Sequence, residues 1–421
     1  MEKVRRHNFT KRFSAWFIAA LMFLAMQAFC DTEAYAALSD VPDITAQSTL
    51  LVDSSRGQVL YSYNANKYTN SMVVNKIMEV LIAVEIGNMS DKPTVSKVAA
   101  DTPAAQAGVL EVGERYAMSD LLYTIMLTSM NDAAVAVAEH IAGDEAAFVA
   151  KMNEKAASLD MKSTNFTNVT GIYDPKQYTT AEDAVKLIRY AIQNQTFNEI
   201  FSTKTKLVDI GENGSTKFLT SDNTMFWSAN TGVDGGKAGY SGEDTITYIT
   251  TAMKDNMRLI CVTMDSALTS ATDDVRKVLG YGFSNYVRSV LAEKNKVFDV
   301  ITVGGNDVEM ITDADVMYVH PIGNSYVKNI EFNITPELEL PIAKNTSVGT
   351  VRYTLSDDTV IDVSMYPNRE ILDDTQWYIA LYENVMRDSV IKNVIIVLLL
   401  LEALLAISKC IIHIKRRKQG G

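Results

Sequence analysis

Residues 121–152 read LLYTIMLTSMNDAAVAVAEHIAGDEAAFVAKM, and this stretch decides the fold. Its apolar residues recur at helical spacing over Leu121–Ile141, which predicts a helix. Inside this run stands the triplet Ser129-Met130-Asn131, an S-x-N element. Residues 232–240 read GVDGGKAGY, a strand-like segment that carries a lysine followed two positions later by a glycine. The two stretches are therefore the first candidates for a site.

Outward from this stretch, residues 40–290 mix strand and helix patterns. Two hairpins are predicted, each from two strand-like runs joined by a short turn: Thr49–Asp53 with Gly57–Tyr63, and Thr245–Met253 with Arg258–Met264. Three further helices are predicted at Lys76–Ile86, Thr180–Ile192 and Val275–Val290. The second begins with Thr180 and has Asp183 three residues on, a variant of the capping box.

After Lys294 the pattern changes to short strands separated by Gly, Asn, Asp and Pro. The predicted strands are Val297–Val303, Ala314–Val319, Val327–Ile334, Gly349–Leu355 and Val360–Met365. This spacing favours a small β-sandwich or barrel-like module, with its boundary near residue 293. The chain is therefore expected to be an α+β domain followed by a smaller β-rich domain.

Both ends of the chain indicate a membrane. Residues 1–36 combine early basic side chains, an apolar stretch and the small-x-small pattern Ala34-Tyr35-Ala36, as in a secretory signal peptide. Residues 394–414 are apolar over about the length that crosses a bilayer, and the basic tail 415–421 follows. We expect a transmembrane anchor with a cytoplasmic tail and the bulk of the protein outside the cell membrane. Glu402 within the span leaves an in-plane amphipathic anchor as the alternative.

The charge and the cysteines exclude several function classes. The net charge is −12, and because residues 1–36 carry +2 and residues 392–421 carry +5, the segment between them is near −19. Such a surface repels phosphate backbones, which argues against a nucleic-acid partner. Cys261 is the one cysteine between the two ends, so no internal disulfide is expected there. Nothing in the sequence indicates a metal or an organic cofactor.

The quoted stretches resemble the serine-type D-alanyl-D-alanine carboxypeptidases, which are low-molecular-mass penicillin-binding proteins. That family combines S-x-x-K, S-x-N and K-T-G motifs. A lysine one helical turn after the serine can take its proton, and the K-T-G strand offers a cation and a hydroxyl to the substrate carboxylate. The likeness spans roughly residues 38–385 and includes the segment PIAKNTSVGT at 341–350 in the β-rich part.

The resemblance implies a penicillin-binding, β-lactamase-like domain at residues 38–292, with an antiparallel sheet and a helical cluster, and a C-terminal domain at 293–385. It assigns catalytic roles to Lys76, Ser129 and Asn131, and substrate-binding roles to Lys237, Ala238 and Gly239. It also implies a peptidoglycan stem peptide ending in D-Ala-D-Ala as the ligand, and β-lactams as ligands bound without a covalent bond.

The chain departs from the family at three places. Residues 71–76 read SMVVNK, so Val73 stands where the family keeps its nucleophilic serine. Ala238 replaces the threonine of K-T-G, and residues 168–171 read NVTG where the family commonly has N-P-H-G. A valine has no lone pair with which to form an acyl-enzyme. These departures predict a protein that is catalytically impaired or inactive.

Three hypotheses follow. The first is an active serine carboxypeptidase that uses another serine, either Ser71 or Ser129; Ser71 precedes Lys76 by five residues, about 140° away around a helix. The second is a non-catalytic relative that binds stem peptides or an envelope partner in the retained cleft. The third is a structural envelope protein whose cleft has no ligand. The second hypothesis accounts for both the retained and the lost groups.

Overall fold

The computed structural model divides the chain into two compact units. The first unit runs to Ser289 and takes in Val319–Asn324, and the second comprises Val290–Tyr318 and the residues from Ser325 onward. The residues described are 40–103, 110–209, 215–303, 306–323, 326–336, 338, 340–372, 382 and 389–418. The predicted signal peptide at residues 1–36 lies outside these ranges.

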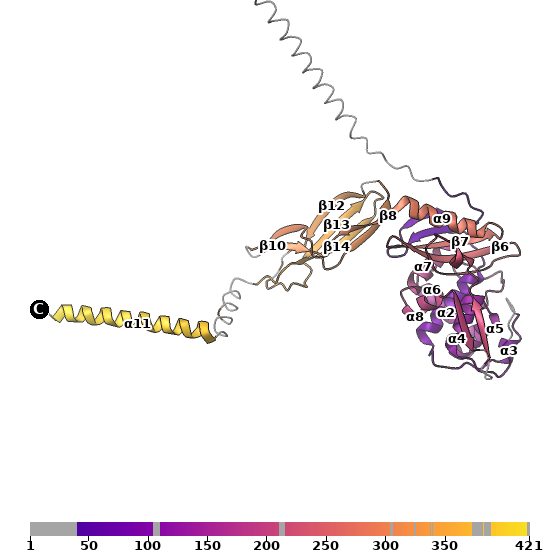
Figure 1. The fold of residues 1–421 in the computed structure, drawn as a ribbon, viewed down its shortest axis with the longest axis horizontal. Coiled ribbons are helices and arrows are strands. Elements are labelled where there is room, and N and C mark those ends of the chain that lie inside the picture. The colour runs from indigo at the N-terminus through magenta and orange to yellow at the C-terminus, as the bar shows by residue number, and fades with distance from the viewer. Residues whose placement is uncertain are drawn as a thin grey trace, which may run out of the picture. The chain divides into compact units, whose positions relative to one another are not determined.

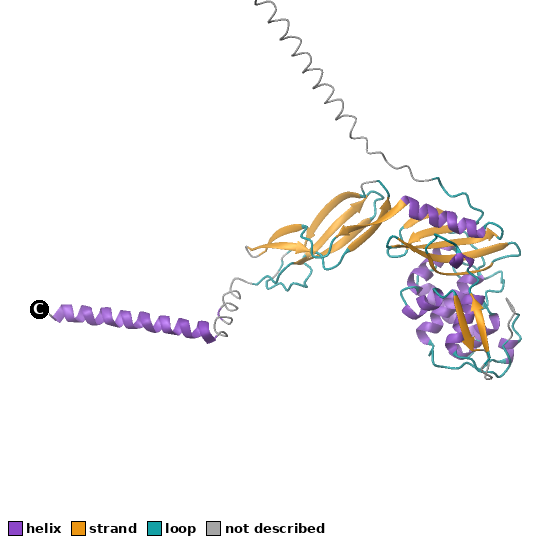
Figure 2. Ribbon diagram, viewed as in Figure 1, coloured by secondary structure: helices purple, strands orange, loops and turns teal. Residues whose placement is uncertain are grey.

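A five-stranded sheet forms the centre of the first unit, in the order β2-β1-β7-β6-β5. Every pair of neighbours is antiparallel. The strands are β1 (Ser48–Asp53), β2 (Val59–Tyr63), β5 (Val233–Tyr240), β6 (Thr245–Lys254) and β7 (Met257–Ala267). Both predicted hairpins are confirmed, as β1 with β2 and β6 with β7 (Figure 2). The antiparallel sheet that the resemblance implied is present.

Helices cover both faces of this sheet (Figure 1). Successive strand residues point to opposite faces, so Leu50 and Val52 of β1 pack among the large helical cluster. Leu51 between them packs on the other side, with Cys261 of β7 and the helix α9 (Ala271–Asn285). Because both faces are covered, every residue of β1 is buried, and its apolar residues Leu50–Val52 are consecutive rather than alternating.

The helical cluster holds α2 at its centre. Residues 73–83 of α2 are all buried, and apart from Asn75, Lys76 and Glu79 they are apolar. The helix ends where the N–H of Gly87 bonds back to the carbonyl of Ala83. The helices are α2 (Met72–Ile86), α3 (Lys97–Ala100), α4 (Met118–Thr128), α5 (Asn131–Ala142), α6 (Glu145–Ser158), α7 (Ala181–Ala191), α8 (Gln195–Phe201) and the 3₁₀ turn η1 (Thr224–Trp227). A short hairpin, β3 (Thr205–Asp209) with β4 (Thr216–Thr220), completes the unit.

Two predicted helices were wrong in extent. The expected helix Leu121–Ile141 is two helices, α4 and α5, because Ser129 adopts a left-handed backbone with φ 59° and Met130 follows in an extended one. Apolar periodicity continues across the break, so the pattern alone does not reveal it. The expected helix Val275–Val290 ends at Asn285, and its last residues belong to the strand β8 (Tyr286–Ala292).

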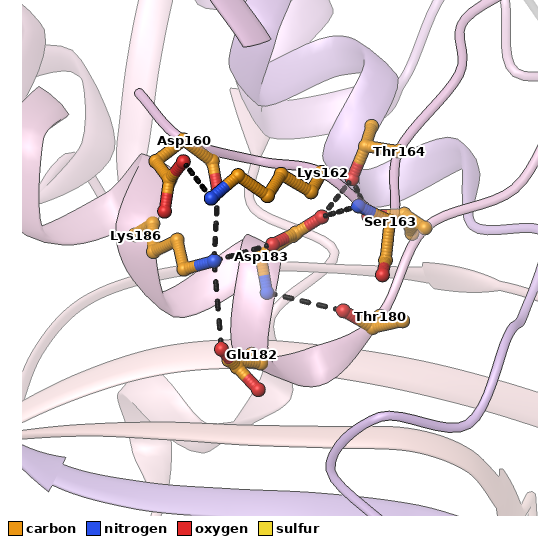
Figure 3. Close-up of polar contacts among 9 residues, drawn as sticks. Asp160, Lys162, Ser163, Thr164, Thr180, Glu182, Asp183 and Lys186 are labelled. Carbon is orange, nitrogen blue, oxygen red and sulfur yellow. Dashed lines mark hydrogen bonds and ion pairs between the residues drawn. The ribbon is translucent and has the colours of Figure 1, made fainter. Parts of the chain in front are cut away.

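The N-terminus of α7 was predicted correctly, and Figure 3 shows its contacts. The hydroxyl of Thr180 accepts a hydrogen bond from the N–H of Asp183 at 3.2 Å, as a capping residue does. The Asp183 carboxylate accepts bonds from the Ser163 N–H and the Thr164 hydroxyl, both at 2.8 Å, and from Lys186 at 2.9 Å. The cap therefore also fixes the segment that precedes the helix.

The second unit is a β-structure, as predicted. Its main sheet has the order β12-β13-β14-β10-β9. The strands are β9 (Asp299–Val303), β10 (Asn306–Ile311), β12 (Val327–Ile334), β13 (Gly349–Leu355) and β14 (Val360–Pro367), and the chain crosses between the units within β8 and β11 (Val316–Pro321). The sequence pattern had missed β10. Apolar side chains such as Met310, Val351 and Met365 form the core of this unit.

A helix at the C-terminal end, α11 (Ser389–Lys418), contains the predicted anchor at residues 394–414. Among the parts of the chain that the structure describes, no helix combines the length and apolarity needed to cross a membrane. The transmembrane assignment stays a prediction.

Candidate functional site

Three separate elements meet at the residues that the sequence motifs selected. The first turn of α2 carries Val73 and Lys76, the break between α4 and α5 carries Ser129, and β5 carries Lys237. A side chain at position 239 would place its Cβ 3.0 Å from a methyl group of Val73. A side chain there would require Val73 to move by a few tenths of an ångström, so glycine favours the close approach of β5 to α2. The structure brings the motifs together within the first unit.

Lys237 lies at the centre of a hydrogen-bond chain. Its ammonium donates to the Ser129 hydroxyl at 2.6 Å and to the Met126 carbonyl at 2.9 Å. The Ser129 hydroxyl in turn donates to the Asp222 carboxylate at 3.2 Å. Burial lowers the pKa of Lys237 to about 8, and the charge of Asp222 opposes that shift. The serine therefore links a buried cation to a carboxylate.

A second buried lysine, Lys76, lies on α2. Its ammonium is 3.4 Å from the Met130 carbonyl and has no exposed surface. Burial lowers the pKa of Lys76 to about 8, against the opposing charges of Glu79, Asp132 and Glu145. Carboxylates therefore surround this lysine in the absence of any ligand.

Glu79, one helical turn after Lys76, is also fully buried. Burial raises the pKa of Glu79 to about 8, although Lys76 and Lys237 act in the opposite direction. Neither carboxylate oxygen has a hydrogen-bond partner among the described residues. We refer to Lys76, Glu79, Lys237 and Asp222 together as the charge cluster. Each lysine in it lies within electrostatic range of a carboxyl group of the protein, Lys76 of Glu79 and Lys237 of Asp222.

Asn131 begins α5 and is buried. Its side-chain amide donates to the Pro103 carbonyl at 2.8 Å. Its side-chain oxygen has no hydrogen-bond partner within the described parts of the chain. An unpaired buried oxygen is costly, so it is an acceptor that a ligand N–H could satisfy.

A pocket of about 680 Å³ opens beside these residues. The described side chains that line it are Met72, Pro103, Ser129, Asn131, Thr170, Ile172, Asp222, Thr224, Tyr240, Ile246, Tyr248, Leu268 and Thr272, together with Gly171 and Gly239. Val73, Ala238 and both lysines are absent from this lining and have no exposed surface. Met72, and not Val73, is the residue of α2 that lines the pocket.

The loop Asn168–Gly171 closes one side of the pocket. The Asn75 amide donates to the Asn168 carbonyl at 2.7 Å, and Glu145 accepts from the Val169 N–H at 3.0 Å. Gly171, at φ 76°, lies so near α2 that a Cβ there would be 2.4 Å from the Met72 Cα. The loop is therefore tied to α2 without the histidine that the family commonly has.

The predicted site residues thus divide into two groups. Ser129, Asn131 and Gly239 line the pocket, while Lys76, Lys237 and Ala238 lie buried behind its wall. Ser71 is buried, its hydroxyl has no partner among the described residues, and it is not part of the pocket lining.

Sequence reasoning missed two members of the charge cluster. Glu79 could have been found, because it is a carboxylate within the otherwise apolar run that follows Lys76. Asp222 had no local signal, since its contact with Ser129 joins residues 93 positions apart.

Comparisons with known proteins match both units of the chain. A family model described as D-alanyl-D-alanine carboxypeptidase, peptidase S11, matches residues 35–267, which is more than half of the chain. A model described as the C-terminal domain of penicillin-binding protein 5 matches residues 288–372.

Curated relatives and solved structures give the same result. D-alanyl-D-alanine carboxypeptidase DacF of Bacillus subtilis is 31% identical over 317 residues, which cover 73% of this chain and 80% of the relative. D-alanyl-D-alanine carboxypeptidase DacA of Escherichia coli is 29% identical over 340 residues, covering 76% of this chain and 82% of the relative. The crystal structure of penicillin-binding protein 5 from Haemophilus influenzae superposes with a TM-score of 0.65 at 26% identity, covering 79% and 99% of the two chains.

Proposed function

The chain belongs to the family of D-alanyl-D-alanine carboxypeptidases, and from this premise we propose that it binds peptidoglycan stem peptides without hydrolysing them. Its fold is that of penicillin-binding protein 5, with a penicillin-binding domain and a β-rich C-terminal domain. The observation that carries the proposal is Val73, a fully buried aliphatic side chain one turn before Lys76 and against Gly239.

The surroundings of Val73 support its assignment to the position of the family nucleophile. The family motif puts the serine three residues before the lysine of the same helix, and Lys76 meets that spacing. The close approach of Gly239 fits the role of the K-T-G glycine. Losing the nucleophile of a serine hydrolase lowers kcat on the order of 10⁶-fold. The covalent route is closed in this protein as long as no other group replaces it.

Two further observations favour loss of catalysis. Ala238 supplies no hydroxyl to a bound carboxylate, and a missing hydrogen bond to a charged group costs about 1.5–3 kcal/mol. The two lysines already have carboxylates of the protein beside them, Glu79 next to Lys76 and Asp222 next to Lys237. The two lysines therefore interact with groups of the protein itself, so a reaction is not needed to explain their presence.

The pocket supports a peptide as the ligand. It combines apolar side chains such as Met72, Ile172 and Leu268 with the polar groups of Ser129 and Asn131. That combination is typical of sites that hold an alkyl side chain and orient an amide beside it. Membership of the family makes the stem peptide of peptidoglycan the candidate that this chemistry fits, with non-covalent binding of β-lactams as a related possibility to be tested.

A second candidate function is hydrolysis by Ser129. It is favoured by one observation, that the Ser129 hydroxyl lines the pocket and lies between Lys237 and Asp222. Ser71 has no comparable support, because it does not line the pocket. The third hypothesis, a structural protein with an empty pocket, predicts no ligand at all.

A fluorescent penicillin separates these functions. The full-length protein is incubated with the reagent at saturating concentration and analysed by denaturing gel and intact mass. We expect no covalent adduct. An adduct of one reagent per chain would overturn the proposal, and peptide mapping together with Ser129→Ala would identify the serine responsible. Titration with a stem peptide then distinguishes a binding protein from a structural one.

We also propose that the protein is exported and held at the cell membrane by residues 394–414. The basic, apolar and cleavage patterns of residues 1–36 and the basic tail after residue 414 support this location. Membrane fractionation compares the full chain with a truncation that ends at residue 388. Recovery of the full chain in the soluble fraction would contradict the anchor.

A further inference from the structure

The pocket has an unusual charge for a site that receives a carboxylate. Among the described residues that line it, Asp222 is the one acidic or basic side chain. Lys76 and Lys237 have no exposed surface and are not part of the lining. A ligand entering the pocket therefore meets a carboxylate before it meets any cation.

Lys237, the cation nearest to the pocket surface, already donates hydrogen bonds to groups of the protein. Lys237 donates to Ser129 at 2.6 Å, and Ser129 donates to Asp222 at 3.2 Å. The polarity of this chain is fixed, because an ammonium only donates and a carboxylate only accepts. The Ser129 proton is thus directed to Asp222 and is not available to a ligand carboxylate. A ligand carboxylate beside Asp222 would either have to break these hydrogen bonds or be repelled by the Asp222 carboxylate.

The neighbouring polar groups also accept rather than donate. The Asn131 side-chain oxygen lacks a hydrogen-bond partner in the described parts of the chain, and its amide nitrogen is used by Pro103. Ala238, buried behind the wall, has no hydroxyl that could donate to a ligand. The hydroxyls of Thr170, Thr224 and Tyr248 can donate, but they carry no positive charge. The polar wall is therefore suited to N–H groups.

We propose that the pocket selects stem peptides whose terminal carboxylate has been converted into an amide, as in an amide-linked peptide, over those that end in a free D-alanine carboxylate. Asp222 is the residue that sets this specificity. It accepts an N–H from the ligand in the place where a carboxylate would be repelled, and Asn131 accepts a second one. This inference rests on the proposed function, since it assumes that the pocket binds stem peptides.

The test compares two ligands that differ in one group. An N-acetylated stem peptide ending in D-Ala-D-Ala is prepared as the free acid and as the C-terminal amide, and both are titrated into the full-length protein by calorimetry. We expect the amide to bind at least about tenfold more tightly, because a carboxylate placed beside the half-buried carboxylate of Asp222 is repelled by a like charge. The substitution Asp222→Asn should bring the two affinities to within about threefold of each other.

A matched control is Asp244→Asn, which removes an exposed carboxylate that does not line the pocket. This variant should keep the preference of the unmodified protein. Equal affinities for acid and amide, or tighter binding of the acid, would overturn the inference while leaving stem-peptide binding intact. If neither ligand binds, the proposed function itself fails, and the inference fails with it.

Discussion

Two sides of the same pocket differ in whether they carry the polar groups of the family motifs. On one side, Lys237, Ser129 and Asp222 keep a connected set of hydrogen bonds. On the other, the start of α2 offers the apolar side chains of Met72 and Val73. The polar side consists of buried charges that depend on one another, whereas a valine in a core depends on nothing but packing. On the proposed function, the motif residues of the polar side are kept for their hydrogen bonds and not for catalysis.

The largest effect should come from placing an oxygen at position 73. If the proposed function is right, the double variant Val73→Ser/Ala238→Thr supplies the nucleophile and the hydroxyl of the family motifs, and even a recovery of one part in a thousand would raise the acylation rate roughly 10³-fold. Fluorescent penicillin measures it, with Val73→Ala/Ala238→Thr as the matched control that opens the same space without an oxygen. If the serine variant still forms no penicillin adduct, the two sides of the pocket differ by more than the two hydroxyl groups introduced.

The polar side should respond strongly to loss of a charge. Lys237→Met removes a buried ammonium that donates to the Ser129 hydroxyl and the Met126 carbonyl, and each buried group that loses such a partner costs about 1–3 kcal/mol. Urea unfolding measures the free energy of unfolding. The exposed Lys254→Met is the control and should change it by less than about 0.5 kcal/mol. A small effect of Lys237→Met would mean that the cluster is not structural.

The pH dependence of stability should reveal Glu79. Its pKa is raised from 4.5 to about 8. The stability it contributes is therefore fully present below pH 4.5 and is lost as the pH rises through 8. Relative to Glu79→Gln, the unmodified protein should lose up to about 1.4 kcal/mol per pH unit across that window. The pKa of Glu79 also depends on the charges of Lys76, Lys237 and Glu145, so the stated slope of stability with pH is an upper value.

Thermal unfolding of the two proteins between pH 5 and pH 8 measures this difference. Glu154→Gln, which removes an exposed glutamate from α6, is the control and should run parallel to the unmodified protein. Parallel curves for Glu79→Gln as well would contradict a proton held at this buried carboxylate.

The smallest expected effect concerns the apolar side. Gly239→Ala adds a methyl group whose carbon would lie 3.0 Å from Val73, and such overpacking costs about 1–3 kcal/mol. Val73→Ala in the same chain should return part of that loss, which a double-mutant cycle on unfolding free energies measures. Gly280→Ala, in α9 with open space around it, should instead be neutral or stabilising by about 1 kcal/mol. Additive effects at positions 73 and 239 would contradict their contact.

The sequence predicted the local elements well because their signals are local. The capping residue Thr180 and both hairpins of the first unit needed only neighbouring residues to be recognised. The break at Ser129 was missed because apolar spacing continues through it while one left-handed residue changes the chain direction. The strand β8 was missed because apolar residues at 286–290 suit a helix as well as a strand.

The motif residues were located by their resemblance, but their environment was not. Whether Lys237 faces a ligand or a carboxylate of the protein depends on Asp222, which a distant loop supplies. Burial of both lysines follows from the packing of α2 against β5, and no local pattern contains that information.

The left-handed backbone at Ser129 has a consequence for how such a chain can diverge. Glycine adopts this conformation freely, while other residues cost roughly 1–2 kcal/mol there. Because serine and not glycine stands at this joint, we infer that the Ser129 side chain contributes more free energy than the backbone strain costs. The same residue sets the angle between α4 and α5, so it is a pivot shared by the scaffold and the pocket.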